Sequence, residues 1–297
     1  MNRLQANSVL LLAAAIWGGG FVAQSTAMTY IGPYWFIGIR FLLAAAVVLP
    51  FALAEGARSE RRLVRRDYGH FALIGVALFG GSALQQVGII HTSVTNSSFL
   101  TGLYVLAVPA IALLVLKKPP HPVVWPAALM ALGGIYLLSG GNLSRLNIGD
   151  WLTIFCALFW AAQMTLVGVF VGPSGRPLML SVVQFLVCGL LGMATGLVTG
   201  EPVSLASITG SWGEILYVGI ISSGLAFALQ VVGQRYTTAP QAAIFLSMET
   251  LFGALGAAIF LDERLVPAGY LGCALMFLAI IMVELLPELG RKKQNPA

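Results

Sequence analysis

Charge is scarce in this sequence. Charged residues make up 9% of the 297 residues, whereas 58% are hydrophobic. A soluble domain carries roughly a quarter charged residues, so this chain lacks the charge to cover a water-facing surface. Long apolar runs recur from Asn7 to Pro287, and each has about the 20 residues that a helix needs to cross hydrocarbon. The composition therefore excludes an ordinary soluble protein and predicts a chain that lies in lipid.

Cysteine and histidine are also rare, with three residues of each. Cys156, Cys188 and Cys273 fall inside apolar runs and have no metal-type spacing, so we interpret them as small packing residues. The sequence contains no Gly-xxxx-Gly-Lys-Ser/Thr loop for ATP, no His-Glu-xx-His, no Gly-x-Ser-x-Gly and no paired intramembrane aspartates. We therefore expect no metal, no cofactor and no enzymatic activity.

Basic residues outnumber acidic ones, which gives a net charge of +5 and a pI near 9.3. Such a balance is typical of proteins that bind nucleic acid. Here, however, the basic residues stand in short clusters between the apolar runs, with no polar domain to present them. We therefore expect a lipid bilayer around the chain and no nucleic-acid partner.

The apolar runs predict an all-α integral membrane protein with ten transmembrane helices. In lipid, every backbone N–H and C=O must be paired within the protein, which leaves only helices and closed barrels. The runs are too long for barrel strands and lack their alternation. The predicted spans are residues 7–28, 34–54, 70–90, 96–116, 122–140, 150–171, 178–199, 212–234, 240–261 and 268–287.

Positive charge is distributed unevenly between the predicted loops. Loops on the cytoplasmic side of a membrane carry an excess of Lys and Arg. With a cytoplasmic N-terminus, two basic residues, Arg145 and Arg264, lie on the outer side, and Arg40 lies inside a span. The other thirteen lie on the inner side: Arg3, Arg58, Arg61, Arg62, Arg65, Arg66, Lys117, Lys118, Arg176, Arg235, Arg291, Lys292 and Lys293. Both termini are therefore predicted to be cytoplasmic, and the short loops without a targeting sequence favour a bacterial inner membrane.

The two halves of the chain repeat each other. The ten residues from Ala83 to Thr92 recur from Ala228 to Thr237 with six identities, at an offset of 145. Trp17 matches Trp160 at a slightly shorter offset of 143. We therefore predict a first repeat over residues 1–141, with spans 1–5. The second repeat covers residues 142–297, with spans 6–10 and a basic cytoplasmic tail.

Five spans are an odd number, so the second repeat enters the membrane from the opposite side. Such inverted repeats are related by a pseudo-two-fold axis in the membrane plane and are typical of secondary transporters, which bind substrate near the midplane. Exchanging the conformations of the two halves exchanges inward-open for outward-open, which is alternating access. The other interpretation is that the duplication only builds a stable bundle.

Short motifs in both halves carry a family resemblance over the whole chain. The residues are Ile16-Trp17-Gly18, Gly38-Ile39-Arg40-Phe41-Leu42-Leu43, Met248-Glu249-Thr250-Leu251-Phe252-Gly253-Ala254-Leu255, Phe260-Leu261-Asp262-Glu263-Arg264-Leu265 and Gly272-Cys273-Ala274-Leu275. With these motifs the chain resembles the drug/metabolite transporter (DMT) superfamily, and within it the ten-helix EamA-type exporters. The resemblance implies export of a metabolite or drug through a central cavity. Substrates in such a superfamily include amino acids, nucleotide sugars, sugar phosphates and cationic drugs, and the fold does not select among them.

Aromatic and amide side chains recur at helical spacing in the first span of each half. Trp17, Phe21 and Gln24 share one face of span 1, and Trp160 and Gln163 share one face of span 6. Two tryptophans related by the pseudo-two-fold axis predict aromatic walls of a cavity. The alternative is that these stripes only pack.

Polar side chains at bilayer depth are costly and usually face a partner or a wet cavity. In span 4, Thr101 and Tyr104 share a face with Ser97, and the repeat offset relates Tyr104 to Glu249 in span 9. Glu249 is the one clear carboxyl in the middle of a predicted span. It is a candidate to carry a proton or to balance a cationic substrate, or it is a neutral group bonded to a helix.

Further candidates lie in spans 3 and 8. Phe79, Ser82 and Gln85 stand in span 3, and Gln85 repeats as Gln230 in span 8. The two amides either line the site or bond between helices, which is common in membranes. Arg40 lies about two turns into span 2. It reaches toward the outer interface, pairs structurally, or binds a carboxylate or phosphate.

Three functional classes follow. We expect first a secondary transporter that exports small metabolites, above all neutral or aromatic amino acids, by alternating access. The aromatic stripes and the scarcity of charge inside the spans favour this class. The second is an exporter of lipophilic cationic drugs with Glu249 as counter-charge, and the third is a non-transporting membrane scaffold, which would need a larger loop or tail. One chain contains both halves, which is compatible with a monomer, although the sequence leaves the oligomeric state open.

Overall fold

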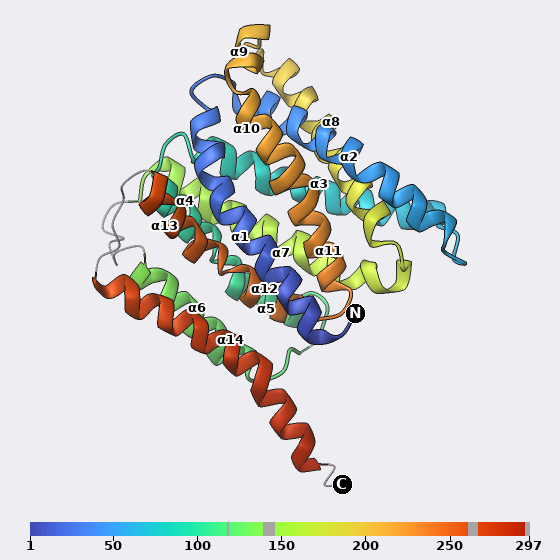
Figure 1. Ribbon diagram of the computed structural model, residues 1–297, viewed down its shortest axis with the longest axis vertical. Helices are drawn as coiled ribbons and strands as arrows, with labels where there is room; N and C mark the ends of the chain where they lie inside the picture. The colour runs from blue at the N-terminus through green and yellow to red at the C-terminus, as the bar shows by residue number, and fades with distance from the viewer. Residues whose placement is uncertain (118, 139–145, 261–266, 295–297) are drawn as a thin grey trace.

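The computed structural model describes residues 1–117, 119–138, 146–260 and 267–294, and within these the chain forms helices and no strand (Figure 1). The predicted repeat boundary at 141 and the motif residues 261–265 lie outside the described residues. So do three of the basic residues used for orientation, Lys118, Arg145 and Arg264.

Six helices lie in the described part of the first half. They are α1 (Arg3–Ala27), α2 (Pro33–Ala57), α3 (Arg65–Gly88), α4 (Val94–Thr101), α5 (Tyr104–Leu114) and α6 (Val124–Leu138). Their starts follow local rules. The Asn2 and Gln5 side chains form a reciprocal capping box at the start of α1, and Pro33 occupies the first turn of α2, where a missing N–H costs nothing.

The second half contains a π-helix in addition to α-helices. Its elements are α7 (Ile148–Ser174), α8 (Pro177–Val198), α9 (Leu205–Gly210), α10 (Trp212–Leu216), the π-helix η1 (Tyr217–Ala226), α11 (Phe227–Gln234), α12 (Ala239–Leu246), α13 (Glu249–Phe260) and α14 (Pro267–Gln294). Elements α10, η1 and α11 follow one another without a gap and together occupy the predicted span 212–234.

Eight helices of the described chain are long and apolar enough to cross a membrane. They are Arg3–Ala27, Pro33–Ala57, Arg65–Gly88, Asn96–Leu114, Ile148–Ser174, Pro177–Val198, Trp212–Gln234 and Ala239–Phe260. The two remaining predicted spans coincide with the shorter apolar helices Val124–Leu137 and Pro267–Met282. The all-helical membrane architecture is therefore confirmed, and the count of ten spans stays a prediction.

Two predicted spans are interrupted in the middle by a tight turn. Between α4 and α5, Leu103 N donates to Leu100 O, and between α12 and α13, Met248 N donates to Phe245 O. These three-residue spacings replace the four-residue spacing of the α-helix. The sequence predicted unbroken helices at both places. The two interruptions are equivalent in the repeats, because Tyr104 and Glu249, the first residues after them, are related by the offset of 145.

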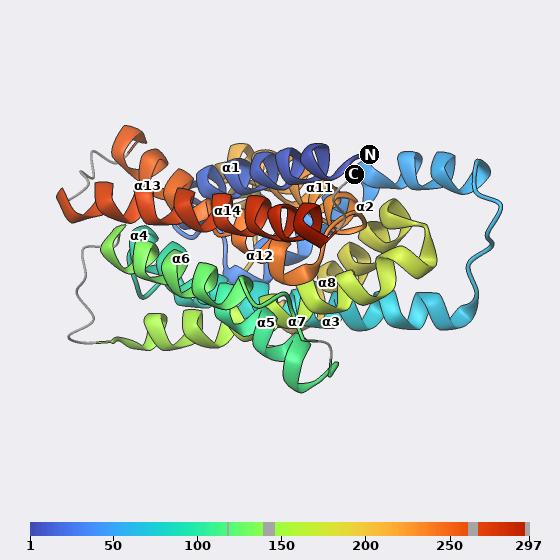
Figure 2. The same cartoon turned by 90° about the horizontal axis from the view of Figure 1, so that it is seen from below.

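Helices from the two halves interleave. The pairs with extensive contact are α2 with α8, α3 with α7, α6 with α14, and α1 with α13. Figure 1 shows α6 and α14 side by side at one edge, and Figure 2 shows α1 and α14 along one face with α3 and α7 along the opposite one. The largest buried hydrophobic cluster contains residues of both halves, including Trp17, Phe41, Trp160 and Phe227. The halves therefore share one core.

Helices α2 and α8 are the second helices of the two halves, and glycines bring them close together. A Cβ on Gly192 would lie 2.8 Å from the backbone N of Gly38, and a Cβ on Gly38 would lie 2.6 Å from Met193 Sδ. Small residues at such positions allow the close backbone approach on which helix association in lipid depends.

Replacing Gly192 by alanine is therefore expected to destabilise the protein by about 1–3 kcal/mol, the usual cost of overpacking. The backbone of Gly38 cannot rotate away as a side chain can. Thermal unfolding of the purified protein in detergent measures the effect. Gly172→Ala is the matched control, because no atom lies within 4 Å of a Cβ built there. Equal melting temperatures for the two variants would contradict close packing at Gly192.

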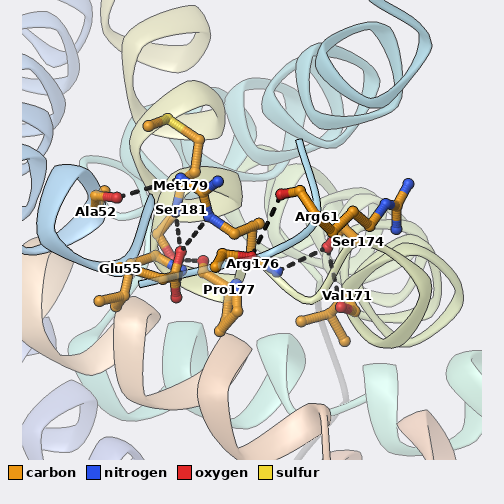
Figure 3. A network of polar contacts seen from close by, with 11 residues as sticks. Ala52, Glu55, Arg61, Val171, Ser174, Arg176, Pro177, Met179 and Ser181 are labelled. Atoms are coloured by element: carbon orange, nitrogen blue, oxygen red, sulfur yellow. Dashed lines mark hydrogen bonds and ion pairs between the residues drawn. The ribbon is translucent and has the colours of Figure 1, made fainter. Parts of the chain in front are cut away.

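Each of these two helices also caps the start of the other. The Glu55 carboxylate, near the end of α2, accepts hydrogen bonds from Leu178 N at 3.2 Å and Met179 N at 3.3 Å in the first turn of α8, and it pairs with Arg176 Nε at 3.3 Å (Figure 3). Glu201, just beyond α8, accepts from Trp35 N at 2.9 Å and from Tyr34 N at 3.4 Å in the first turn of α2. A carboxylate at a helix start satisfies free N–H groups and the helix dipole.

The two caps show that α2 and α8 run antiparallel, with the end of one beside the start of the other. We call them the inner cap (Glu55, Arg176) and the outer cap (Glu201), using the predicted orientation for the names. Together they fasten α2 and α8 to each other at both ends of the pair.

Candidate functional site

A cavity opens where the interrupted helices meet α1, α2 and α7. Its volume is about 30 Å³, enough for water but too small for an amino acid. Twelve residues line it: Trp17, Phe21, Gln24, Arg40, Gln85, Thr101, Tyr104, Trp160, Met164, Ser222, Phe227 and Glu249. They come from both halves of the chain, so the site exists only when the halves are packed together.

Aromatic rings form one wall of the cavity, with Phe227 at their centre. The Phe227 ring centroid lies 4.6 Å from that of Trp17 and 5.6 Å from that of Trp160, on which it stacks at an interplanar angle of 23°. Phe41 and Phe185 approach Phe227 from behind, at 5.9 and 6.1 Å. Offset and tilted rings at these distances attract one another, so the wall is a connected cluster that also presents flat apolar surface to the cavity.

The two repeat-related tryptophans differ in their polar contacts. Trp17 Nε1 donates to the carbonyl of Ser222 at 3.0 Å, inside the π-helix. Trp160 Nε1 is buried without a hydrogen-bond partner among the described residues. An unpaired buried donor costs free energy, so the Trp160 N–H has a hydrogen bond to gain.

The interruption between α12 and α13 places Glu249 in the cavity wall, beside Tyr104 from the start of α5. Both side chains are buried, with 4% and 1% of their surface exposed. The Oε1 atom of Glu249 has no hydrogen-bond partner among the described residues. Discontinuous helices near the midplane form binding sites in many transporters, because the breaks bring polar groups to bilayer depth.

Arg40 belongs to the cavity lining, and the structure shows it bonded to a neighbouring helix rather than reaching outward. Its Nη1 donates to Gln24 Oε1 at 2.8 Å, and its guanidinium lies 4.8 Å from the Phe41 ring centroid and 5.3 Å from that of Phe36. The side chain is 4% exposed, so it does not extend to the interface. Arg40 therefore brings a positive charge to the cavity.

Gln85 and Thr101 complete the polar part of the lining. Gln85 Nε2 donates to Thr101 Oγ1 at 3.3 Å, and Thr101 Oγ1 donates to the carbonyl of Ser97 at 2.7 Å. Ser97 lies behind Thr101 and is fully buried. The two side chains thus hold each other in place at the cavity edge.

Four of the predicted site residues lie outside the lining. Gln163 and Gln230 bond to each other at 3.0 Å, and further bonds extend to Gln184, Gln234 and the carbonyl of Met164. This amide network joins α7, α8 and α11, which favours the interhelical interpretation for both residues.

Phe79 and Ser82 are the other two. Phe79 is partly buried against the main hydrophobic cluster, and Ser82 is fully buried in α3. The structure therefore brings together eight of the twelve predicted residues, and their part in binding stays a prediction. Among the residues that the structure describes, no group of three or more His, Cys, Asp or Glu side chains could hold a metal ion.

Three lining residues, Met164, Ser222 and Phe227, were not predicted from the sequence, and for Arg40 contact with a substrate was one of the interpretations left open. The repeat contained a signal for two of them. The offset of 145 relates Ser82 to Phe227, and the offset of 143 that relates the two tryptophans also relates Phe21 to Met164. The two offsets therefore predict Met164 from Phe21 and Phe227 from Ser82.

Comparisons with known proteins agree with this architecture. The profile of the EamA-like transporter family matches the chain twice, over residues 4–140 and 147–285. A protein of Archaeoglobus fulgidus named "Uncharacterized transporter" is 33% identical over 285 residues, covering 96% of this chain and 87% of the relative. The inner membrane transporter YedA of Escherichia coli is 22% identical, covering 91% and 87%.

A plant relative and a solved structure extend the comparison. The WAT1-related protein At3g02690 of Arabidopsis thaliana, described as chloroplastic, is 21% identical over 93% of this chain and 69% of its own length. A crystal structure at 18% identity superposes with a TM-score of 0.78 over 96% of this chain and 98% of its own, which shows the same fold. A helical membrane bundle in two repeats, matched by the family profile in each, identifies this chain as a member of the EamA-like transporter family of the DMT superfamily, and so as a multi-pass membrane transporter.

Proposed function

We propose that this transporter exports neutral amino acids, above all aromatic ones, as a secondary transporter with alternating access. The observation that carries the proposal is the cavity wall of Trp17, Phe227 and Trp160, which is shared between the halves. Such a wall suits a flat apolar side chain. The polar groups of the opposite wall suit the charged end of an amino acid. Transport would be driven by the gradient of the substrate itself or by protons.

We also propose ten spans in inverted topology, with both termini in the cytoplasm. The antiparallel run of α2 and α8 supports the inversion, because equivalent helices of inverted repeats must point in opposite directions. Figure 1 draws the start of α1 and the end of α14 at the same end of the bundle, which supports a common side for the termini. Relatives named as inner membrane transporters support a bacterial inner membrane.

The cavity volume of about 30 Å³ supports a cycle in which the site widens to admit substrate. The tight turns at α4–α5 and α12–α13 and the π-helix η1 are places where helices can change direction, because their hydrogen bonds depart from the α-helical ladder. All three adjoin lining residues. Motion at these points would open the site without separating α2 from α8.

Counterflow of labelled phenylalanine into proteoliposomes tests the proposal, and it needs no knowledge of the energy source. Wild-type protein is expected to accumulate label when unlabelled phenylalanine is inside. Trp160→Ala is expected to lower the initial rate about tenfold, because it removes a stacking surface from the site. Trp151→Ala is the control, since Trp151 lies on the same helix and is 48% exposed. Absence of counterflow for every neutral amino acid, with folded protein, would reject the proposal.

Export of lipophilic cations is the second candidate. Glu249 supports it, because an unpaired carboxylate in an aromatic cavity attracts a cation. Arg40 in the same cavity counts against it, because its positive charge repels one. Counterflow of a labelled aromatic cation that exceeds the counterflow of phenylalanine would reverse this order.

A further inference from the structure

Two ionisable side chains, one basic and one acidic, line the cavity, and the described structure gives neither an ionic partner. Arg40 and Glu249 are each 4% exposed. Ion pairs of the described residues, such as Arg61–Asp67 and Arg176–Glu55, do not include them. Burying an isolated charge is far more costly than burying a paired one. Both groups therefore have interactions to gain from a ligand.

Arg40 is held in place by neutral groups. Its hydrogen bond to Gln24 uses one Nη1 donor, and the rings of Phe36 and Phe41 contact its guanidinium. The Nε donor is buried without a partner among the described residues. A guanidinium can bind a carboxylate through two parallel N–H donors, so Arg40 is oriented and still has donors free.

Glu249 is the complementary case. The Oε1 atom is buried in the wall, and the carboxyl lies beside the Tyr104 hydroxyl but pairs with no cation among the described residues. Its position follows from the tight turn before α13, which places it in the cavity lining. Arg40 and Glu249 line the same cavity but do not form an ion pair with each other.

Two partly buried carboxylates at helix starts show how a structural acid is satisfied here. Glu55 accepts from Leu178 N and Met179 N and pairs with Arg176, and Glu201 accepts from two backbone N–H groups. In each of these side chains both carboxylate oxygens accept a hydrogen bond. Arg40 and Glu249 form no ion pair among the described residues, and both line the cavity.

We propose that Arg40 and Glu249 determine the charge specificity of the site: Arg40 binds the carboxylate of a zwitterionic substrate, and Glu249 binds its ammonium group. This inference rests on the proposed function and names the chemical class that the site selects. A zwitterion satisfies both buried charges at once, whereas an anion or a cation leaves one of them unpaired, which costs affinity. The apolar side chain of the substrate then lies along the wall of Trp17, Phe227 and Trp160.

Phenylalanine and two analogues that each lack one of its charged groups test the inference. Phenethylamine lacks the carboxylate, and 3-phenylpropionate lacks the ammonium group. Their dissociation constants are measured from the tryptophan fluorescence of the purified protein. Wild-type protein is expected to bind phenylalanine about tenfold or more tightly than either analogue, because each analogue leaves one charge unpaired.

The variants should show a crossed pattern. Arg40→Gln is expected to remove the preference for phenylalanine over phenethylamine and to keep the preference over 3-phenylpropionate. Glu249→Gln is expected to remove the preference for phenylalanine over 3-phenylpropionate and to keep the preference over phenethylamine. Arg40→Lys retains the charge and should retain part of the preference over phenethylamine. General damage to the fold would instead raise the dissociation constants of all three ligands by the same factor.

If both variants bind all three ligands more weakly by the same factor, the assignment of Arg40 and Glu249 is overturned. The proposal of amino-acid export is not affected by that result. Wild-type protein that binds phenylalanine no better than either analogue would overturn the inference directly. If folded wild-type protein binds none of the three, the proposed function fails as well. Failure of the inference alone is thus distinguishable from failure of the function.

Discussion

Replacing Phe227 by alanine is expected to lower both the stability of the protein and its phenylalanine counterflow. The ring lies among Trp17, Phe41, Trp160 and Phe185 and is 5% exposed. Truncation of a buried Phe costs about 3–5 kcal/mol through lost contacts and the space that remains. One side of the ring faces the cavity, so the lower end of this range is expected, about 3 kcal/mol. Thermal unfolding and counterflow measure the two effects on the same preparation.

Two further variants separate packing from binding at this position. Phe227→Leu keeps most of the apolar volume and should cost less than about 1.5 kcal/mol, while counterflow stays low because the ring is absent. Phe155→Ala, at a position 53% exposed on α7, should leave both quantities near wild type. A leucine variant that transports phenylalanine at the wild-type rate would show that Phe227 only packs.

Replacing Glu55 by alanine is expected to destabilise the protein by about 3 kcal/mol or more, the cost of breaking a largely buried ion pair. The side chains of Glu55 and Arg176 are 17% and 8% exposed. The change leaves Leu178 N and Met179 N without their acceptor, and Arg176 keeps a bond to the carbonyl of Ala52 at 3.4 Å. Net stabilities of proteins are about 5–15 kcal/mol, so the loss is a large fraction. Chemical or thermal unfolding in detergent measures it.

A graded series makes this prediction specific. Glu201→Ala removes the outer cap, which has backbone donors but no Arg, and should cost about 1–2 kcal/mol, the usual effect of losing a helix cap. Arg61→Ala breaks the pair with Asp67, in which Arg61 is 43% exposed, and should cost less than about 1 kcal/mol. A Glu55 variant as stable as the Arg61 variant would contradict a stabilising role for the inner cap.

The helical membrane architecture was predictable because lipid imposes it on any chain with such apolar runs. The interruptions were not. Gly102 offers a local signal for the turn before α5, but the residues Leu246 to Glu249 include no Gly or Pro. The turn before α13 therefore depends on packing between segments far apart in the sequence, which residue patterns do not record.

The candidate site was predictable where the repeat relates one residue to another. Trp17 and Trp160, and likewise Tyr104 and Glu249, were found as related pairs, and all four line the cavity. Arg40 was not assigned to it, because the sequence does not show that Gln24 from another helix would hold its guanidinium. For Gln230, the sequence left two interpretations open, since an amide in a span looks the same whether it faces a ligand or another amide.

The reciprocal caps of α2 and α8 have a consequence for biosynthesis. The groups that meet in them stand more than 120 positions apart in the chain, with Leu178 bonded to Glu55 and Trp35 bonded to Glu201. While the ribosome is still making the second half, the N–H groups of Tyr34 and Trp35 have no carboxylate to bind, and the glycine face of α2 has no partner helix. Until α8 has been inserted beside α2, the first half therefore lies in the bilayer without these hydrogen bonds and without this helix contact. Maturation of this transporter is thus tied to completion of its synthesis, and a chain that ends early would present unfinished helix surfaces to cellular quality control.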